Sequence, residues 1–142
     1  MLARAVRDEY TRPTHWRVFP DTTATLSLLK ARGWRHVLLS NHVPELAKLV
    51  EALGLSPFFD AIHTSALSGY EKPHSLAFLN AIPDGVDIQH TVMIGDSQQA
   101  DVEGAEALGI RAFLVRKPNP RSEDQVSQLM HIAEALDDPK PV

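Results

Sequence analysis

The feature that most constrains the fold is the run Thr91–Asp101, in which an apolar stretch stops at a glycine and two acids follow. The apolar residues predict a short buried strand that ends at Gly95, and the residues after it predict a helix over 98–108. The residue that follows such a strand lies at the carboxyl edge of a parallel sheet, where open α/β folds bind their ligands. We therefore expect Asp96 at this edge, with Asp101 about one turn into the helix and facing the same crevice.

The two acids admit two interpretations. Two carboxylates that converge on one point repel each other unless a cation or a buried lysine lies between them, and oxygen-only ligands suit Mg²⁺. Alternatively, Asp96 caps the helix and Asp101 lies on a solvated helix face. The spacing alone leaves both interpretations open.

Composition limits the other classes of function. The chain has 142 residues, enough for one domain, and a formal net charge of −4, which disfavours nucleic-acid and acidic-membrane partners. It has no cysteine, no apolar run long enough to span a bilayer and no signal-peptide pattern. We expect a cytoplasmic protein that lacks disulfides and thiolate chemistry.

Strand and helix patterns alternate along the chain. We predict helices over 22–32, 44–53, 76–82, 98–108 and 122–136, and strands over 35–39, 61–65, 91–95 and 111–115. Such alternation over short loops predicts βαβ units, and hence an α/β fold of Rossmann-like, three-layer type with helices on both faces of a parallel sheet.

Right-handed crossovers bring the carboxyl ends of parallel strands to one edge. That edge collects Ser40, Asn41, Ser65 and Asp96, and Lys72 can reach it from the loop after the second predicted strand. A hydroxyl, a lysine and two carboxylates are what a phosphate plus Mg²⁺ requires. The hydroxyl of Ser40 and the backbone N–H of Asn41 can hold phosphate oxygens, and Lys72 can neutralise charge.

The seven histidines do not form a recognisable metal motif, because none stands in an HxxxH or HExxH arrangement. His42 and His74 directly follow residues of the predicted site, so each either contacts substrate or faces solvent.

Three segments, in their order and spacing, resemble motifs two, three and four of the haloacid dehalogenase (HAD) superfamily of hydrolases. They are Ser40-Asn41, Gly69–Pro73, and Gly95–Asp101 with Gly104-Ala105 beyond. The resemblance covers roughly residues 16–118 and includes the segment 54–60.

The resemblance implies a HAD-like core and a role for each site residue. Ser40 would bind the transferring phosphoryl group, and Lys72 would position and screen the nucleophile. Asp96 would ligate Mg²⁺, with Asp101 ligating directly, through water or through Lys72. The implied activity is a Mg²⁺-dependent phosphatase that acts on a small phosphomonoester through an aspartyl-phosphate. Dehalogenation is less favoured, because the paired acids indicate a metal.

The chain departs from the family pattern at motif one, since it contains no Asp-x-Asp-Gly-Thr sequence. The faint likeness at 19–23 places Phe19 at the nucleophile position, and a phenyl ring attacks nothing. We interpret Phe19 to Asp21 as the re-entry from a cap domain. Residues 1–19 are then a remnant of a cap or linker, 20–136 the HAD-like core and 137–142 a frayed tail.

On this interpretation the core is incomplete at its first strand, which in the family lies between the strands of motifs two and four. Two apolar strand edges would face a gap with their N–H and C=O groups unpaired. Three outcomes are open. The segment His15–Phe19 could substitute for the strand, the two halves of the sheet could close on each other, or a second chain could supply the strand.

We expect these residues alone to be inactive, for want of the nucleophile. The alternatives are a non-catalytic module that binds phosphate and Mg²⁺ or acts as a scaffold, and a gene fragment without activity.

Overall fold

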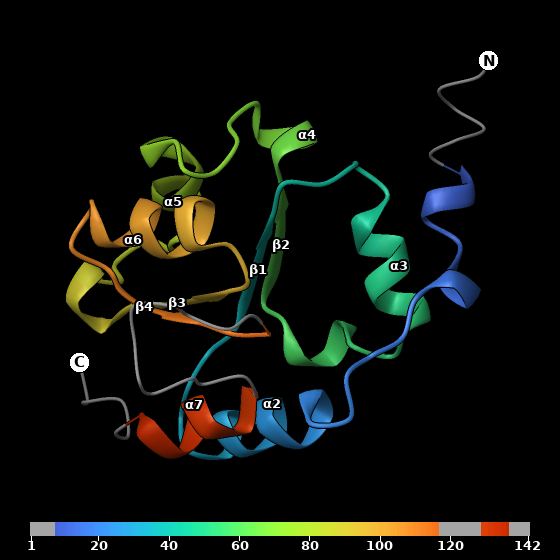
Figure 1. The fold of residues 1–142 in the computed structure, drawn as a ribbon, viewed down its shortest axis with the longest axis horizontal. Coiled ribbons are helices and arrows are strands. Elements are labelled where there is room, and N and C mark those ends of the chain that lie inside the picture. Colours follow the sequence, from blue (N-terminus) through green and yellow to red (C-terminus); the bar gives the residue numbers. More distant parts are fainter. Residues whose placement is uncertain (1–7, 117–128, 137–142) are drawn as a thin grey trace.

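Four short apolar runs form the strands of the structure, a computed structural model that describes residues 8–116 and 129–136 (Figure 1). The strands are β1 (Val37–Ser40), β2 (Ala61–Thr64), β3 (Val92–Gly95) and β4 (Arg111–Leu114). The helices are α2 (Thr22–Ala31), α3 (Leu46–Ala52), α4 (Ser65–Ser68), α5 (Ser75–Ala81), α6 (Gly104–Glu106) and α7 (Leu129–Ala135). A π-helical turn over Gln98–Glu103 runs directly into α6.

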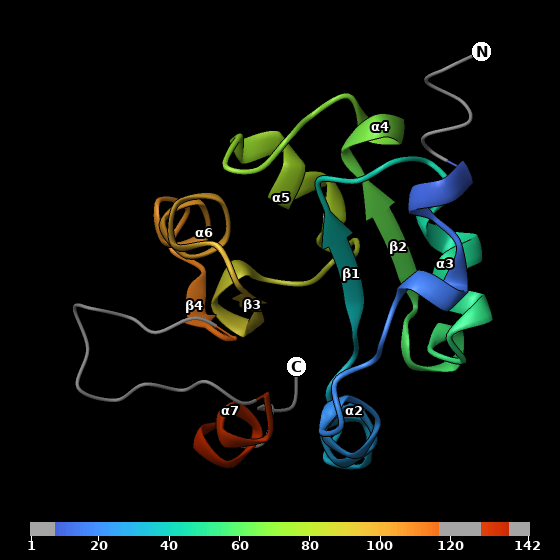
Figure 2. The ribbon, with the colours of Figure 1, turned by 45° about the vertical axis from the view of Figure 1, so that its right-hand side comes forward.

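The strands form two parallel pairs, here called the two half-sheets, rather than one continuous sheet. β1 pairs with β2, with Val37 opposite Ala61, and β3 pairs with β4, with Val92 opposite Arg111. Within the described residues no ladder joins β1 to β3, and Figure 2 shows the two pairs standing apart. The predicted parallel α/β fold is confirmed, and its sheet is incomplete, as predicted.

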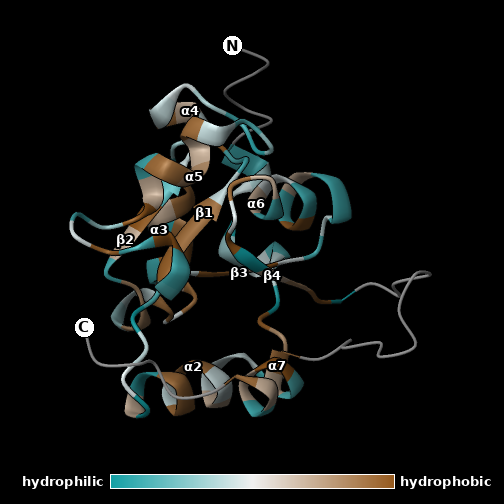
Figure 3. Ribbon diagram, turned by 90° about the vertical axis from the view of Figure 1, so that its left-hand side faces the viewer, coloured by the Kyte–Doolittle hydropathy of each residue, from teal (hydrophilic) through white to brown (hydrophobic). Residues whose placement is uncertain are grey.

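Three apolar clusters give the fold its layers. On β3, Val92 and Ile94 pack toward α2 and α7, while Met93 points to the opposite face, toward α5 and α6. On β1, Leu38 packs toward α3 and Leu39 toward the α5–α6 cluster. Neighbouring residues of a strand face opposite sides, so both half-sheets lie between helices, as a three-layer fold requires. Figure 3 shows hydrophobic residues along β1 and in the surrounding helices.

The segment before α2 does not replace the missing strand. Pro13–His15 form a 3₁₀ turn, and Trp16 packs with the α3 cluster. The indole Nε1 of Trp16 donates to the carbonyl of Tyr10 (2.7 Å). Two of the three arrangements left open by the sequence, substitution by His15–Phe19 and direct closure of the sheet, are therefore not adopted.

An ion pair joins α2 to the end of β4 and to α7. The Asp21 carboxylate accepts from Arg116 Nη2 (2.6 Å) and from the Met130 N–H (3.2 Å). Arg116 has a left-handed backbone conformation (φ 65°). Its guanidinium also lies 4.0 Å from the centre of the Phe19 ring. By residue type, Asp21 or Thr22 is predicted to cap α2. Asp21 precedes the helix, but its side chain makes this ion pair instead of a capping hydrogen bond.

Most helix boundaries agree with the sequence prediction, with three differences. Ala24, which the sequence pattern predicts on the inward face of this helix with Leu26 and Leu29, faces solvent, because the buried stripe of α2 is Thr25, Leu26 and Leu29. The short helix α4 was not predicted. The final predicted helix is described only from Leu129, and its earlier part, like the predicted tail over 137–142, lies outside the described residues. Across the described ranges, no helix has the length and apolar character needed to cross a membrane.

Candidate functional site

A buried ion pair lies at the carboxyl ends of the two half-sheets. Lys72 Nζ is 2.5 Å from Asp101 Oδ1, and the two side chains are 9% and 5% exposed. Nζ also donates to the carbonyl of Leu39 (3.1 Å), and Asp101 Oδ2 accepts from the N–H of Ser97 (3.1 Å). The interpretation of Asp101 as a solvated helix residue is wrong, because packing of the π-helical turn against Gly95 buries its carboxylate.

The loop that carries Lys72 is fastened to the end of β1 by Asn41. The side-chain amide of Asn41 donates to the Lys72 carbonyl (3.1 Å) and accepts from the Lys72 N–H (2.9 Å). This pair of bonds satisfies both backbone groups of Lys72 and directs its side chain into the space between β1 and β3. Asn41 was predicted to contribute its backbone N–H, and this side-chain function was not foreseen.

Two glycines allow the close approach of these elements. A Cβ at Gly95 would lie 2.1 Å from Asp101 Oδ2, so the buried carboxylate occupies the place of a side chain there. A Cβ at Gly104 would lie 2.9 Å from Pro73 Cβ and 3.0 Å from the ring of Phe78. Glycine at these two positions lets the π-helical turn and α6 pack against β3 and the Lys72 loop.

Ser40 and Asp96 are each flanked on both sides by residues that contact the ion pair or its loop. Leu39 and Asn41 bond to Lys72, and Gly95 and Ser97 contact Asp101. The structure thus brings the chain at Ser40, Asn41, Lys72, Asp96 and Asp101 to one edge of the fold.

The side chain of Asp96 does not cap the following helix. Ser97 does so, because its hydroxyl accepts from the N–H of Ala100 (3.0 Å). Asp96 is instead exposed at the end of β3. Ser97 is therefore a site residue that the sequence interpretation missed. A serine directly after Gly-Asp, where a helix begins, is a typical helix cap and could have indicated it.

The remaining predicted residues lie at the margin of the site. Ser65 is partly buried at the start of α4. The His74 ring accepts from the N–H of Leu76 (3.1 Å) and caps α5. The His42 ring stacks on Tyr10 with centroids 5.3 Å apart, and neither of its ring nitrogens has a hydrogen-bond partner among the residues that the structure describes. Substrate contact by His42 or His74 stays a prediction.

The oxygen ligands at this edge fit Mg²⁺, and one of the two carboxylates, that of Asp96, is directly available to the ion. In the described part of the chain, no three histidine, aspartate or glutamate side chains gather at a single point. Both oxygens of Asp101 already have partners, whereas Asp96 is exposed beside it. Mg²⁺ commonly takes one or two protein carboxylates and completes its shell with water and phosphate, which this arrangement allows.

Comparison with known proteins identifies a family of similar sequences. A haloacid dehalogenase-like hydrolase family model matches residues 2–109. The bovine haloacid dehalogenase-like hydrolase domain-containing protein 3 is 33% identical over 96% of this chain and 58% of its own length. The glyceraldehyde 3-phosphate phosphatase of Methanothermobacter thermautotrophicus is 36% identical over 75% of this chain and 48% of its own length.

The structural comparison gives the same result. A HAD phosphatase from Thermococcus onnurineus superposes with a TM-score of 0.80 at 27% identity, covering 89% of this chain and 61% of that one. The chain thus spans roughly half to three fifths of the length of these relatives. The chain belongs to the haloacid dehalogenase-like hydrolase family.

Proposed function

We propose that this chain forms the phosphate-binding and metal-binding part of a Mg²⁺-dependent phosphatase that acts on a small phosphomonoester through an aspartyl-phosphate. The observation that carries the proposal is the buried Lys72–Asp101 pair, which connects the carboxyl ends of β1 and β3. Relatives that are named phosphatases, among them the archaeal glyceraldehyde 3-phosphate phosphatase, support the reaction class.

The residues at the end of β1 would hold the phosphoryl group. The Ser40 hydroxyl can donate to a phosphate oxygen. The side chain of Asn41 is committed to the Lys72 backbone, so Asn41 would contribute its backbone N–H. A fixed N–H and hydroxyl cost no reorganisation when negative charge develops on the phosphoryl oxygens.

Lys72 would supply the positive charge of the site. Its Nζ is held by Asp101 and by the Leu39 carbonyl, so the ammonium keeps one direction and two of its three N–H donors are used. The third donor remains for a nucleophile carboxylate or a phosphate oxygen. Asp101 would act as a positioning residue, because it reaches the reacting atoms through Lys72.

Asp96 would hold the metal. A bound Mg²⁺ would polarise a phosphoryl oxygen and neutralise its charge. The partnered oxygens of Asp101 favour an indirect role, through Lys72 or through water, over direct ligation.

The reaction also requires a carboxylate nucleophile. The sequence has no Asp-x-Asp-Gly-Thr motif, and in the one passage with a faint likeness to it, residues 19–23, Phe19 stands at the nucleophile position. We therefore expect these 142 residues to bind phosphate and Mg²⁺ without turnover. The second candidate, a non-catalytic binding or scaffolding module, is favoured by this same departure.

The test measures binding and turnover separately. Titration calorimetry with Mg²⁺ in the presence of inorganic phosphate should give saturable binding that Asp96→Asn weakens at least tenfold. Asp84→Asn, which removes an exposed acid outside the site, should leave binding unchanged. Equal effects of the two substitutions, or no binding at all, would refute the proposed site.

Turnover is then measured on p-nitrophenyl phosphate with Mg²⁺, for the chain alone and after adding a separately made segment that carries an Asp-x-Asp-Gly-Thr motif. Hydrolysis that requires the added segment supports the phosphatase. Binding without hydrolysis in either assay supports the binding module. Hydrolysis by the chain alone shows that the nucleophile is among these residues.

A further inference from the structure

Two pairs of aromatic side chains lie beside the candidate phosphate site. The rings of Tyr10 and His42 are stacked, with centroids 5.3 Å apart and planes inclined by 30°. The rings of Tyr70 and His74 have centroids 4.9 Å apart and planes inclined by 38°. Both tyrosines are exposed, Tyr10 at 51% and Tyr70 at 37%. These four residues are here called the aromatic rim.

Hydrogen bonds at the site fix the place of the aromatic rim. His42 directly follows Asn41, whose side chain holds both backbone groups of Lys72. Tyr70 and His74 each stand two residues from Lys72, so their Cα atoms lie within about 7.6 Å of the Lys72 Cα. Figures 1 and 2 show the loop after β1 and the loop between α4 and α5 at the same end of the molecule. Both aromatic pairs thus start from the residues around the contact of Asn41 with Lys72.

The fold holds the histidine of each pair in place. The His74 ring accepts from the N–H of Leu76 (3.1 Å) at the start of α5. The His42 carbonyl accepts from the N–H of Ala66 (3.4 Å), and the His42 ring also packs against Trp16, with centroids 5.9 Å apart. Each exposed tyrosine therefore rests on a ring that is already ordered, so a further ring can stack there at little cost in ordering.

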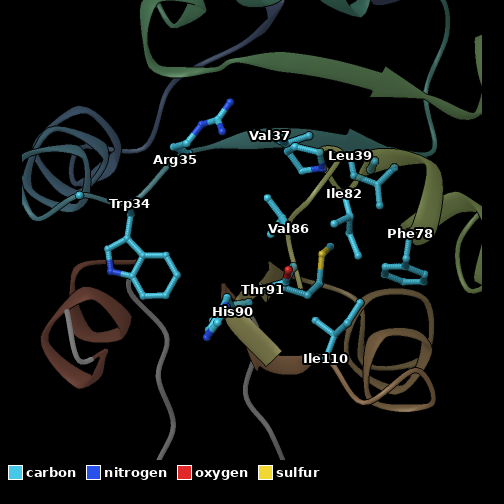
Figure 4. Close-up of a pocket in the computed structure, with 15 residues that line it drawn as sticks. Trp34, Arg35, Val37, Leu39, Phe78, Ile82, Val86, His90, Thr91 and Ile110 are labelled. Carbon is cyan, nitrogen blue, oxygen red and sulfur yellow. The ribbon is translucent and has the colours of Figure 1, made fainter. Parts of the chain in front are cut away.

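An apolar cavity of about 260 Å³ between β1 and β3 is another place where the organic part of a substrate could lie (Figure 4). The cavity extends from Leu39 to Trp34 and His90, at the amino ends of the strands. The buried pair of Lys72 and Asp101 lies at the carboxyl ends, and Lys72 Nζ bonds to the carbonyl of Leu39 in the cavity wall. An organic group that entered the cavity from the phosphate site would have to displace this pair. The aromatic rim is reached without such a displacement.

The charges around the rim disfavour a substrate with a second acidic group. The segments 40–42 and 69–74 contain no arginine and one lysine, Lys72, which is already paired with Asp101. Glu71, in the same loop, is exposed. A carboxylate beside the phosphate would therefore meet a like charge and, within these segments, no further lysine or arginine. An uncharged ring has no such cost and gains by stacking on a tyrosine.

We propose that the aromatic rim binds the organic part of the substrate, so that the site prefers phosphomonoesters of uncharged aromatic or heteroaromatic groups to aliphatic or carboxylate-bearing esters. This inference rests on the proposed function, because it requires the phosphoryl group to be held at Ser40 and Lys72. Tyr70, the tyrosine nearer to Lys72 along the chain, supplies the principal ring face, and His74 supports it.

A purely structural function of the rim has different consequences. The Tyr10 pair also joins the segment before α2 to the end of β1, since Trp16 Nε1 donates to the Tyr10 carbonyl (2.7 Å). If the rings only held the chain together, their removal would weaken the binding of every phosphate ligand alike. The test therefore substitutes Tyr70 and measures a ratio of affinities between ligands.

The ligands are phenyl phosphate, ethyl phosphate and phosphoglycolate, titrated by NMR with Mg²⁺ at about pH 8, where their phosphate groups are dianions. We expect phenyl phosphate to bind at least threefold more tightly than the other two, since one aromatic contact contributes about two- to tenfold. Tyr70→Ala should reduce this ratio about twofold or more. Tyr70→Phe should keep it, and so should Leu28→Ala, which truncates an exposed apolar residue of α2.

Histidine ring protons locate the bound phenyl group. Its ring current should shift the signals of His42 and His74 with phenyl phosphate and not with ethyl phosphate. The signal of His90, which lines the cavity, should stay in place (Figure 4).

Each other outcome has a definite meaning. Equal affinity for phenyl and ethyl phosphate, tighter binding of phosphoglycolate, or a shift of His90 in place of His42 and His74 would overturn the inference. An equal loss of all three esters in Tyr70→Ala would do the same, because it indicates a structural function. In these cases, binding of inorganic phosphate with Mg²⁺ leaves the proposed phosphatase standing. Failure of inorganic phosphate to bind would reject the proposed function, and the preference for aromatic esters with it.

Discussion

The carboxylate of Asp101 lies where a side chain at Gly95 would begin, with Oδ2 only 2.1 Å from the position of a Cβ. The acid of the π-helical turn and the last residue of β3 therefore constrain each other. Any residue larger than glycine at position 95 displaces the carboxylate, and with it the partner of Lys72.

Gly95→Ala should consequently destabilise the fold by about 3 kcal/mol, the upper range for overpacking, because the buried ion pair is disrupted as well. Urea unfolding measures the loss. Gly54→Ala is the control: it meets no atom within 4 Å, so only its φ of +75° is unfavourable, at about 1–2 kcal/mol. When Asp101 is already replaced by glycine, adding Gly95→Ala should lower the free energy of unfolding only slightly further. An equal loss in both backgrounds would show that the contact is not the cause.

Lys72→Met should cost about 3–5 kcal/mol of folding free energy, because it leaves the Asp101 carboxylate buried without a counter-charge. The double variant Lys72→Met/Asp101→Asn should recover more than half of that loss. Asp60→Asn breaks the ion pair with Arg35, in which the Asp60 side chain is 46% exposed and the Arg35 side chain 68%. This substitution should cost under about 1 kcal/mol of folding free energy. Chemical denaturation of the unsubstituted chain and these three variants checks the ranking, and a double variant that loses as much stability as Lys72→Met would argue against a coupled pair.

Asp21 should make the fold sensitive to acid. The hydrogen bond from Arg116 lowers the pKa of Asp21 below its usual 3.8; burial opposes this shift, and the Met130 N–H adds to it. A pKa that is lower in the folded state stabilises the fold at pH above 3.8, and this contribution is lost as the pH falls through the folded-state value. Between about pH 5 and pH 3, Asp21→Asn should lose less stability than the unsubstituted chain. Asp84→Asn is the comparison, and parallel pH curves for all three would exclude the effect.

His36 should make the stability of the fold depend on pH in a less acidic range than Asp21 does. Burial lowers the pKa of His36 below 6.5 and Lys30 lowers it further, while the hydrogen bond to the Phe58 carbonyl raises it. The fold therefore favours the neutral ring, so stability is highest above pH 6.5 and declines as the pH falls from there toward the folded-state value. Thermal melts from about pH 7.5 to pH 5.5 should show a shallower decline for His36→Gln. His131→Gln, on the exposed side of α7, should follow the unsubstituted chain.

The positions of the strands could be predicted because each is an apolar run stopped by glycine or a polar residue. Gly95 and the run before it gave both the end of β3 and the place of Asp96. The absent first motif predicted an incomplete sheet, but it left open whether the two halves would close on each other, and the structure shows that they stay apart.

The details of the site could not be predicted, because they depend on how loops meet in space. The use of the Asn41 amide to hold the Lys72 backbone requires two segments, 31 residues apart, to dock at one angle. Likewise, Ser97 and Asp96 were equally good helix caps by residue type, and only the direction of the chain after β3 selected the serine. The stacking of His42 on Tyr10 has no periodic signal in the sequence.

Division of the sheet also bears on how the molecule melts. The buried cluster around β1 and β2 consists of Leu46, Leu49 and Val50 of α3, whereas the β3–β4 pair is packed on one face against α2 and α7 and on the other against α5 and α6. Because no ladder in the described residues joins β1 to β3, the β1–β2 pair with α3 can lose its order before the β3–β4 pair and its helices. Calorimetry should then resolve two overlapping endotherms.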